Sequence, residues 1–197
     1  MKKIALILLV VIVLPLIYLI VSNYNNVPKL DENVKEKWSQ VQNQYKRRAD
    51  LIPNLVSTVK AYAAHEKDTF IEVTEARSKV SQMNINADTL NNPAAMQQFT
   101  QAQAGLSGAL SKLMLVVEKY PDLKANSNFM ALQSQLEGTE NRITVARKDF
   151  IEAVKKYNVE LRTMPGKLVA AIVHPSASVK ETFKATQAEQ EAPKVQF

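Results

Sequence analysis

The sequence contains no cysteine and only four glycines among its 197 residues. The absence of cysteine excludes disulfide bonds, thiolate metal sites, a cysteine nucleophile and a lipid anchor on cysteine. The scarcity of glycine, together with 46% hydrophobic residues, argues against a disordered, collagen-like or strand-and-turn chain. The two histidines are far apart in sequence, so we expect no histidine-rich metal centre. We also expect no cofactor.

Strong positive charge is also lacking, because 25 Lys and Arg residues against 19 Asp and Glu give a net charge of only +6. The basic residues are scattered, apart from the triplet Lys46-Arg47-Arg48. A nucleic-acid interface would need a basic face interleaved with aromatic side chains, so we expect no nucleic-acid partner. Attraction to anionic lipid headgroups is a milder alternative.

Charged residues are absent from a continuous apolar run, Ile4–Val21. Its 18 residues span about 27 Å as a helix, close to the thickness of the hydrocarbon core of a bilayer. The run is longer than the apolar region of a signal peptide, and no Ala-x-Ala site follows it. We therefore predict an uncleaved transmembrane anchor at residues 4–21, with a short flank at 1–3 and a juxtamembrane linker at 22–28.

The charges that flank the anchor bear on its orientation. Lys2 and Lys3 precede the run, which favours a cytoplasmic N-terminus and an extracytoplasmic body. The three lysines Lys29, Lys35 and Lys37 lie beyond the other end and weaken this bias.

Apolar residues beyond the anchor recur in alternating steps of three and four, the pattern of a helix packed along a long seam. The first stripe contains Val34, Trp38, Val41, Tyr45, Ile52, Leu55, Val59, Tyr62, Phe70, Val73 and Val80. It predicts a helix from about Lys29 to Gln82. Because Pro53 cannot donate to the carbonyl of Ala49, we expect a kink or break near residues 49–53.

Two more stripes follow an Asn-rich loop at residues 83–92. Asn92-Pro93 supplies a cap and a first-turn proline for the second helix, whose stripe runs from Phe99 to Tyr120. The third stripe runs from Phe129 to Leu161 and ends at Met164-Pro165-Gly166. We then expect a short helix at 167–173, a break at His174-Pro175, a last helix from Ser178 and a polar tail at 189–197.

These patterns predict an all-α fold. The expected architecture is an N-terminal transmembrane helix followed by an elongated antiparallel bundle of three long helices plus short C-terminal helices, over residues 29–188. Gly105 and Gly108 weaken the second long helix unless a neighbouring helix approaches closely there.

Two long blocks of the sequence are distinctive. The first is WSQVQNQYKRRADLIPNLVSTVKAYAAHEKDTF, Trp38 to Phe70, followed by EVTEARS, Glu72 to Ser78. The second is ENRITVARKDFIEAVKKYNVELRTMPGKLVA, Glu140 to Ala170. With the N-terminal anchor, these blocks closely resemble the LemA family over nearly the whole chain. The chain departs from many members near its C-terminus, where Val173-His174 stands in place of a Gly-Phe pair.

The resemblance implies a single-pass protein of the bacterial inner (plasma) membrane with a helical body and no established enzymatic activity. Family descriptions often place the short N-terminus outside and the body in the cytoplasm. The charges around the anchor favour the opposite arrangement, so both topologies stay open.

The most distinctive motif covers Lys46-Arg47-Arg48-Ala49-Asp50 and the Pro53-Asn54 pair that follows. Arg48 falls on the apolar seam, where a guanidinium needs a carboxylate or carbonyl partner. In the structural interpretation, these arginines pair with acidic groups of the third helix, Glu137, Glu140 or Asp149. In the functional interpretation, the motif docks another subunit or a lipid phosphate.

The remaining candidate residues have simpler explanations. Trp38 lies on the apolar stripe and is expected in the core. In the alternative interpretation, Tyr24, Trp38 and Tyr45 contact lipid or another protomer. His65-Glu66 lacks the second histidine of a zinc motif, and His174-Pro175 is expected in a turn. We predict no catalytic, metal-binding or cofactor-binding residue. The structural or interaction motif is Trp38, Tyr45, Lys46, Arg47, Arg48, Asp50, Pro53 and Asn54.

Taken together, these features predict a non-enzymatic, membrane-anchored helical scaffold of the bacterial cell envelope. We expect it to act by forming a homo-oligomer or by binding another envelope protein. The alternatives are a non-catalytic regulator or subunit of a membrane protease or hydrolase, and an anionic-lipid-binding protein that remodels membranes. The sequence has no Gly-rich phosphate loop and no Ser-elbow motif that would favour an enzyme.

Overall fold

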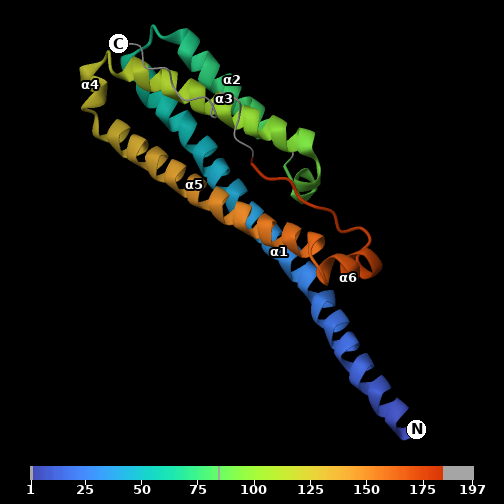
Figure 1. Ribbon diagram of the computed structural model, residues 1–197. Helices are drawn as coiled ribbons and strands as arrows, with labels where there is room; N and C mark the ends of the chain where they lie inside the picture. The colour runs from blue at the N-terminus through green and yellow to red at the C-terminus, as the bar shows by residue number, and fades with distance from the viewer. Residues whose placement is uncertain (1, 84, 184–197) are drawn as a thin grey trace, which may run out of the picture. The chain divides into compact units, whose positions relative to one another are not determined.

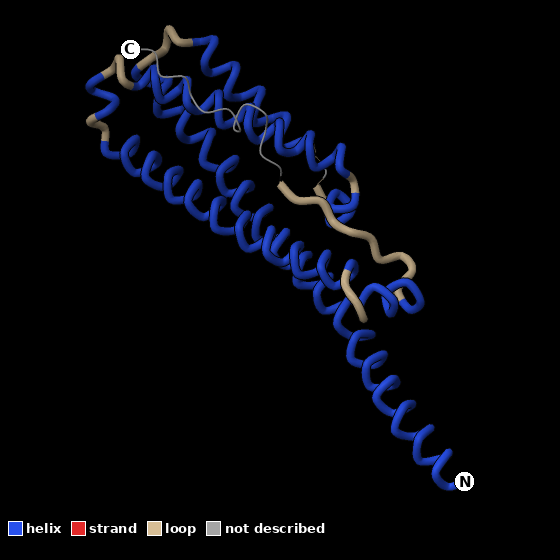
Figure 2. The backbone as a smooth tube through the Cα atoms, viewed as in Figure 1, coloured by secondary structure: helices blue, strands red, loops and turns tan. Residues whose placement is uncertain are grey.

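The structure is a computed structural model that describes residues 2–83 and 85–183. Some side chains between residues 2 and 23, and that of Asp88, lie outside this description, as does the polar tail predicted at 189–197. Helices, turns and loops make up the described residues, and no strand occurs among them (Figure 2). The prediction of an all-α fold is therefore confirmed.

The helices are labelled in Figure 1. In chain order they are α1 (Lys2–Tyr62), α2 (Lys67–Gln82), the 3₁₀ helix η1 (Ala87–Asn91), α3 (Pro93–Val117), α4 (Pro121–Lys124), α5 (Ser127–Arg162) and α6 (Gly166–Val173).

The chain divides into two compact units. Unit 1 consists of residues 1–45 and 141–180, and unit 2 consists of residues 46–140 and 181–197. Unit 1 therefore takes the first part of α1, the second part of α5 and the whole of α6. Unit 2 takes the end of α1, the helices α2, α3 and α4, and the start of α5.

The core of unit 1 lies between antiparallel stretches of α1 and α5 (Figure 1). Trp38 packs against Phe150 with ring centroids 5.1 Å apart. The stripe residues that the seam pattern predicts here are buried: Val34, Trp38, Val41, Tyr45, Ile143, Ala146, Phe150, Val154 and Tyr157. Burial of these side chains is the main source of stability for the helix pair.

The core of unit 2 is built by the end of α1, the helices α2 and α3, Leu123 of α4 and the start of α5. Helices α2 and α3 run antiparallel after the short connection through η1 (Figure 1). The buried cluster contains Ile52, Leu55, Val59, Phe70, Val73, Leu106, Leu113, Val116, Phe129 and Leu136. Tyr62 is the stripe residue that departs from the prediction, because it lies half-exposed at the last turn of α1.

A kink or break is predicted near residues 49–53, and the structure shows that the helix is not broken there. Helix α1 continues past Pro53 without interruption and ends at Tyr62, and the chain turns at residues 63–66 before α2. Neither glycine nor proline occurs in this turn, so no local signal marks it in the sequence. The helix predicted over 29–82 is therefore two helices.

The last predicted helix is also wrong where the structure describes it. Residues 178–183 are not helical, and residues 184–197 lie outside the described part. The backbone here bonds to other segments instead of to itself. In unit 1 the amide of Lys180 donates to Asn158 Oδ1, and in unit 2 the amide of Glu181 donates to the carbonyl of Leu90.

Other predicted boundaries are confirmed. Asn92 caps α3, because its Oδ1 accepts from the amides of Ala94 and Ala95 at 3.1 and 3.2 Å. Helix α6 occupies the range predicted for the short helix. A Cβ added at Gly105 or Gly108 would meet no atom within 4 Å, so these glycines do not accommodate a closely packed helix.

Within the described residues, none of the helices combines the length and the apolar character needed to cross a membrane. The structure therefore does not confirm the anchor predicted at residues 4–21. The backbone of that run belongs to α1, and several of its side chains lie outside the description. Residues 22–28, expected as a linker, are helical and continuous with the rest of α1.

Candidate functional site

The structure separates the predicted motif into buried and exposed residues. Trp38 and Tyr45 are buried in the core of unit 1, as expected for stripe residues. In unit 2, Arg48 is buried. The other members are exposed on α1: Lys46, Arg47, Asp50, Pro53 and Asn54. The motif therefore has a structural part and an exposed polar part, and the role of the exposed part in binding stays a prediction.

Arg48 is the centre of a polar cluster inside unit 2, which we call the Arg48 cluster: Arg48, Gln103, Ser107 and Glu140. Only 2% of the Arg48 side chain is exposed. Its Nη1 donates to Glu140 Oε1 at 2.8 Å and to Ser107 Oγ at 3.0 Å. Its Nη2 donates to the side-chain and backbone oxygens of Gln103.

The Arg48 cluster links three helices, since Arg48 is on α1, Gln103 and Ser107 are on α3, and Glu140 is on α5. Glu140 is one of the three partners that the sequence predicts, so the structural interpretation of Arg48 is confirmed for this residue. Glu140 is 44% exposed, so the guanidinium is buried while its carboxylate stays partly hydrated. This arrangement fixes the register of α1 against α3 and α5.

A second arginine explains how α1 tolerates Pro53. Proline has no N–H, so the carbonyl of Ala49 has no helical donor. Arg77 of α2 supplies one, because its Nε donates to the Ala49 oxygen at 2.9 Å. Arg77 is 28 residues from Ala49 in the sequence. The residues around Pro53 therefore could not indicate that its missing donor is replaced.

The same device occurs in unit 1, at Pro28. Pro28 has no N–H, so the carbonyl of Tyr24 has no helical donor. The Nε2 of His174 lies 2.9 Å from that carbonyl oxygen. The rings of Tyr24 and His174 also lie 5.2 Å apart. His174, which the sequence placed in a turn, is the C-cap of α6 and connects that helix to α1.

A buried cation in unit 1 was missed by the sequence analysis. We call it the Lys180 cluster: Asp31, Tyr157, Asn158 and Lys180. The Lys180 side chain is 7% exposed, and its Nζ lies 2.8 Å from Asp31 Oδ1 and 5.0 Å from the centre of the Tyr157 ring. The side chain of Asn158 bonds to both the amide and the carbonyl of Lys180.

The Lys180 cluster shifts the pKa values of its members. Burial opposes ionisation of Asp31, but hydrogen bonds and positive charge from Lys180 and Lys35 outweigh it, so the pKa of Asp31 is below its ordinary value. Hydrogen bonds to Asp31 and Glu32 raise the pKa of Lys35. Burial, and then the negative charge of Asp31, raise the pKa of Tyr157. The only local signal for this cluster is Asp31, four residues before Lys35.

His65 and Glu66 lie in the turn between α1 and α2. Glu66 Oε1 lies 3.5 Å from the Tyr120 hydroxyl and 3.8 Å from Lys119 Nζ. Within the described residues, no group of three or more histidine, aspartate or glutamate side chains is placed to hold a metal ion.

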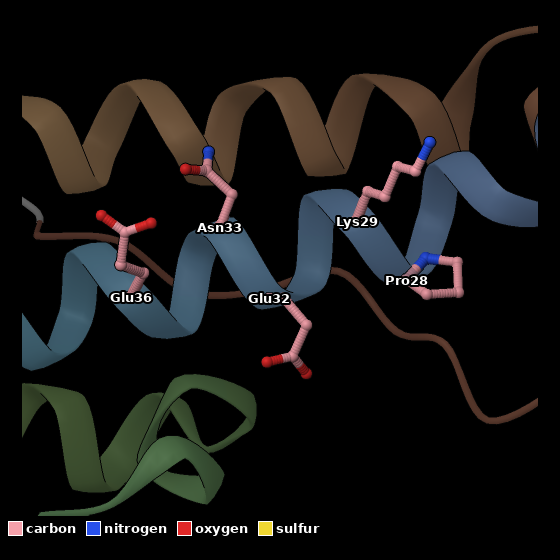
Figure 3. Close-up of a pocket in the computed structure, with 5 residues that line it drawn as sticks. All are labelled: Pro28, Lys29, Glu32, Asn33 and Glu36. Carbon is pink, nitrogen blue, oxygen red and sulfur yellow. The ribbon is translucent and has the colours of Figure 1, made fainter.

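Two shallow hollows lie on the surface of unit 1. One, of about 590 Å³, is lined by Pro28, Lys29, Glu32, Asn33 and Glu36, all from α1. Figure 3 shows that Asn33 and Glu32 point to opposite sides of the helix, so these side chains do not converge on a ligand. The other, of about 420 Å³, is lined by Gln40, Asn43, Gln44, Asn141, Arg142, Val145, Ala146 and Asp149.

Comparisons with known proteins agree with the resemblance seen in the sequence. The model of the LemA family matches residues 37–197. The chain is 25% identical to magnetosome protein MamQ 2 of Paramagnetospirillum magneticum, over 78% of the chain and 62% of the relative. It is 25% identical to magnetosome protein MamQ of Magnetospirillum gryphiswaldense, with the same coverage. It is 23% identical to protein LemA of Metamycoplasma hominis, over 82% of the chain and 70% of the relative.

Proposed function

The chain belongs to the LemA family, and on this basis we propose that it is a membrane-tethered helical scaffold that binds further copies of itself or other envelope proteins. The chain spans 62% of the length of the MamQ relatives that it matches, so functions of those longer proteins are not assumed for it.

The observation that carries the proposal is the exposure of large apolar side chains at the start of α1. Ile4, Ile7, Leu9, Val11 and Leu14 are each about 60% exposed. Soluble monomers rarely expose so much contiguous apolar surface, because each buried Å² of it is worth about 25 cal/mol. A bilayer core would cover these side chains along the whole predicted anchor, residues 4–21.

The buried polar groups support a structural rather than a chemical role. Arg48 and Lys180 are each paired with a carboxylate inside one unit. Arg77 and His174 are used to satisfy carbonyls that prolines leave without a donor. These four side chains thus hold helices in register, which a scaffold requires.

Association follows from tethering. Confinement to a membrane raises the local concentration of identical chains, so weak contacts between helical bodies become effective. The exposed residues of the motif provide a polar surface for such contacts on unit 2: Lys46, Arg47, Asp50 and Asn54. Arginine in particular suits a carboxylate or phosphate on a partner.

Vesicle flotation of the full chain tests the tether. We expect the wild-type protein to float with vesicles after an alkaline wash. Replacing Leu9 and Leu14 together by Glu should lower the floating fraction more than tenfold, because each charge costs about 2.5–3.5 kcal/mol in a bilayer core. The matched control replaces Ile71 and Leu115, equally exposed residues of unit 2, by Glu.

Two outcomes would reject the tether. The wild-type chain would stay at the bottom of the gradient, or the α1 variant would float as well as the control variant.

A further inference from the structure

Helix α6 carries exposed apolar side chains that do not pack into the core of unit 1, and we call them the α6 stripe. The stripe consists of Leu168 and Ile172, four residues apart and 55% and 72% exposed, and Met164, 71% exposed, lies in the turn just before the helix. The opposite face of α6 buries Gly166, Val169 and Ala170 in unit 1. The helix is therefore amphipathic, with one face in the core and the other open to solvent.

The contact between His174 and Tyr24 fixes where the α6 stripe lies in unit 1. His174 caps α6, and its Nε2 lies 2.9 Å from the carbonyl oxygen of Tyr24. Tyr24 follows the last residue of the predicted anchor, Val21, by three residues, which is about 4.5 Å along a helix. Figure 1 shows α6 beside α1 at this level of unit 1. The α6 stripe is therefore next to the end of the apolar run.

The exposed charges along the α6 segment are basic, and the half-buried carboxylate of Glu160 reaches the start of α6 beside Gly166. No Asp or Glu occurs from residue 162 to residue 180. Arg162 and Lys167 are both exposed in this stretch. A segment with exposed apolar groups, basic groups and no acidic group is the kind that anionic lipid headgroups attract.

We propose that the α6 stripe lies in the headgroup layer of an anionic bilayer and forms a second membrane contact beside the anchor. The proposal rests on the proposed tether, because α1 brings α6 to the bilayer surface. Two side chains on an eight-residue helix, with Met164 in the turn before it, are too few for a stable dimer, which buries about 800 Å² on each partner. Added to an anchor, they suffice to orient unit 1 on the membrane.

Site-specific fluorescence tests the α6 contact, and the absence of native cysteine makes single labels straightforward. Full chains with Ile172→Cys or Leu168→Cys carry an environment-sensitive NBD probe in vesicles of phosphatidylcholine and phosphatidylglycerol at 3:1. The matched control is Val145→Cys on α5 of unit 1, which is 60% exposed and lies 17 residues, about 26 Å, before the end of that helix.

We expect lipids that carry a doxyl quencher to reduce NBD fluorescence at positions 168 and 172 at least twofold, with little effect at position 145. Aqueous iodide should quench in the reverse order. Omitting phosphatidylglycerol should weaken the lipid quenching at 168 and 172.

Other results would overturn the α6 contact. Equal iodide quenching at 172 and 145 would mean that the stripe is in water. Protection of both 168 and 172 from iodide and from doxyl lipid would mean that protein covers it. If the labelled chains float with the vesicles in either case, the tether stands and only the α6 contact fails. If the chains do not float, the tether itself fails.

Discussion

At the residue scale, the two buried cations show how this protein stabilises charge in a helical core. Arg48 reaches acceptors on two neighbouring helices, and Lys180 is held by a carboxylate and an aromatic ring. A buried charge costs several kcal/mol of desolvation, so its partners determine whether the fold tolerates it. Removing a partner should therefore cost more than removing a surface ion pair.

Asp31→Asn tests the Lys180 cluster. The substitution leaves Lys180 buried without a countercharge, so we expect a loss of about 2–3 kcal/mol in the free energy of unfolding, below the full buried-pair cost because Asp31 is 24% exposed. Glu32→Gln is the matched control, since Glu32 pairs with Lys35 from a position that is 71% exposed, and should cost less than about 1 kcal/mol. Denaturant unfolding of both variants measures the difference.

The lowered pKa of Asp31 gives this effect a pH dependence. A carboxyl with a lowered folded-state pKa contributes stability above its unfolded pKa and loses that contribution as the pH falls through the folded value. The gap between wild type and Asp31→Asn should be full at neutral pH and should shrink below the ordinary value of 3.8. A gap that is unchanged at low pH would contradict the ion pair.

Arg48→Met tests the Arg48 cluster, because methionine keeps most of the side-chain stem and removes the guanidinium. We expect a loss of about 1–3 kcal/mol, since the buried oxygen of Gln103 loses its donor. Arg47→Met, at an exposed neighbouring position, should change stability by less than about 0.5 kcal/mol. Equal melting temperatures for the two variants would show that Arg48 has no structural role.

At the element scale, two prolines of α1, Pro28 and Pro53, are tolerated through side chains from other segments of the chain. Arg77 serves the carbonyl that Pro53 leaves without a donor, and His174 does so for Pro28. These contacts explain why α1 is not broken near residues 49–53, where Pro53 predicts a kink or a break. The sequence shows where a backbone donor is missing, but not which distant side chain replaces it.

A double-mutant cycle tests the Arg77 contact. Arg77→Met should cost about 1 kcal/mol in the wild-type background, because the carbonyl of Ala49 loses its donor. In the Pro53→Ala background the residue 53 amide bonds to that carbonyl, so the same substitution should cost at least about 0.5 kcal/mol less. An identical cost in both backgrounds would show that Arg77 does not compensate for the proline.

Alanine substitutions at the helix glycines should change the stability in opposite directions. Gly105→Ala and Gly108→Ala should each stabilise the protein by about 0.5–1 kcal/mol, because the new methyl groups meet no atom within 4 Å and alanine favours the helix. Gly166→Ala should destabilise it by about 1–3 kcal/mol, since a Cβ there would lie 2.4 Å from the Glu160 carbonyl oxygen. Thermal unfolding of the three variants checks the signs, and stabilisation by Gly166→Ala would be the clearest contradiction.

Helix boundaries could be predicted from the sequence where a residue acts locally. Asn92 and Pro93 mark the start of α3 by their own chemistry, and the apolar stripes identify the buried faces of α1, α3 and α5. The turn at residues 63–66 and the irregular backbone at 178–183 depend on long-range contacts, such as that of Asn158 with Lys180. Arg48 was predictable because its seam position demands a partner, whereas Lys180 has no comparable position on a stripe.

At the scale of the whole molecule, a tethered scaffold has to bind further copies of itself or other envelope proteins. Each unit has its own core and its own buried ion pair. Membership of the LemA family is consistent with such a role.

The mass of the full chain, extracted in mild detergent and measured by light scattering with the detergent subtracted, tests the central claim most directly. The account predicts a protein mass that is a multiple of 22.0 kDa, or a particle that retains a second protein, across micromolar concentrations. A single 22.0 kDa chain at every concentration, with no other protein retained, would contradict it.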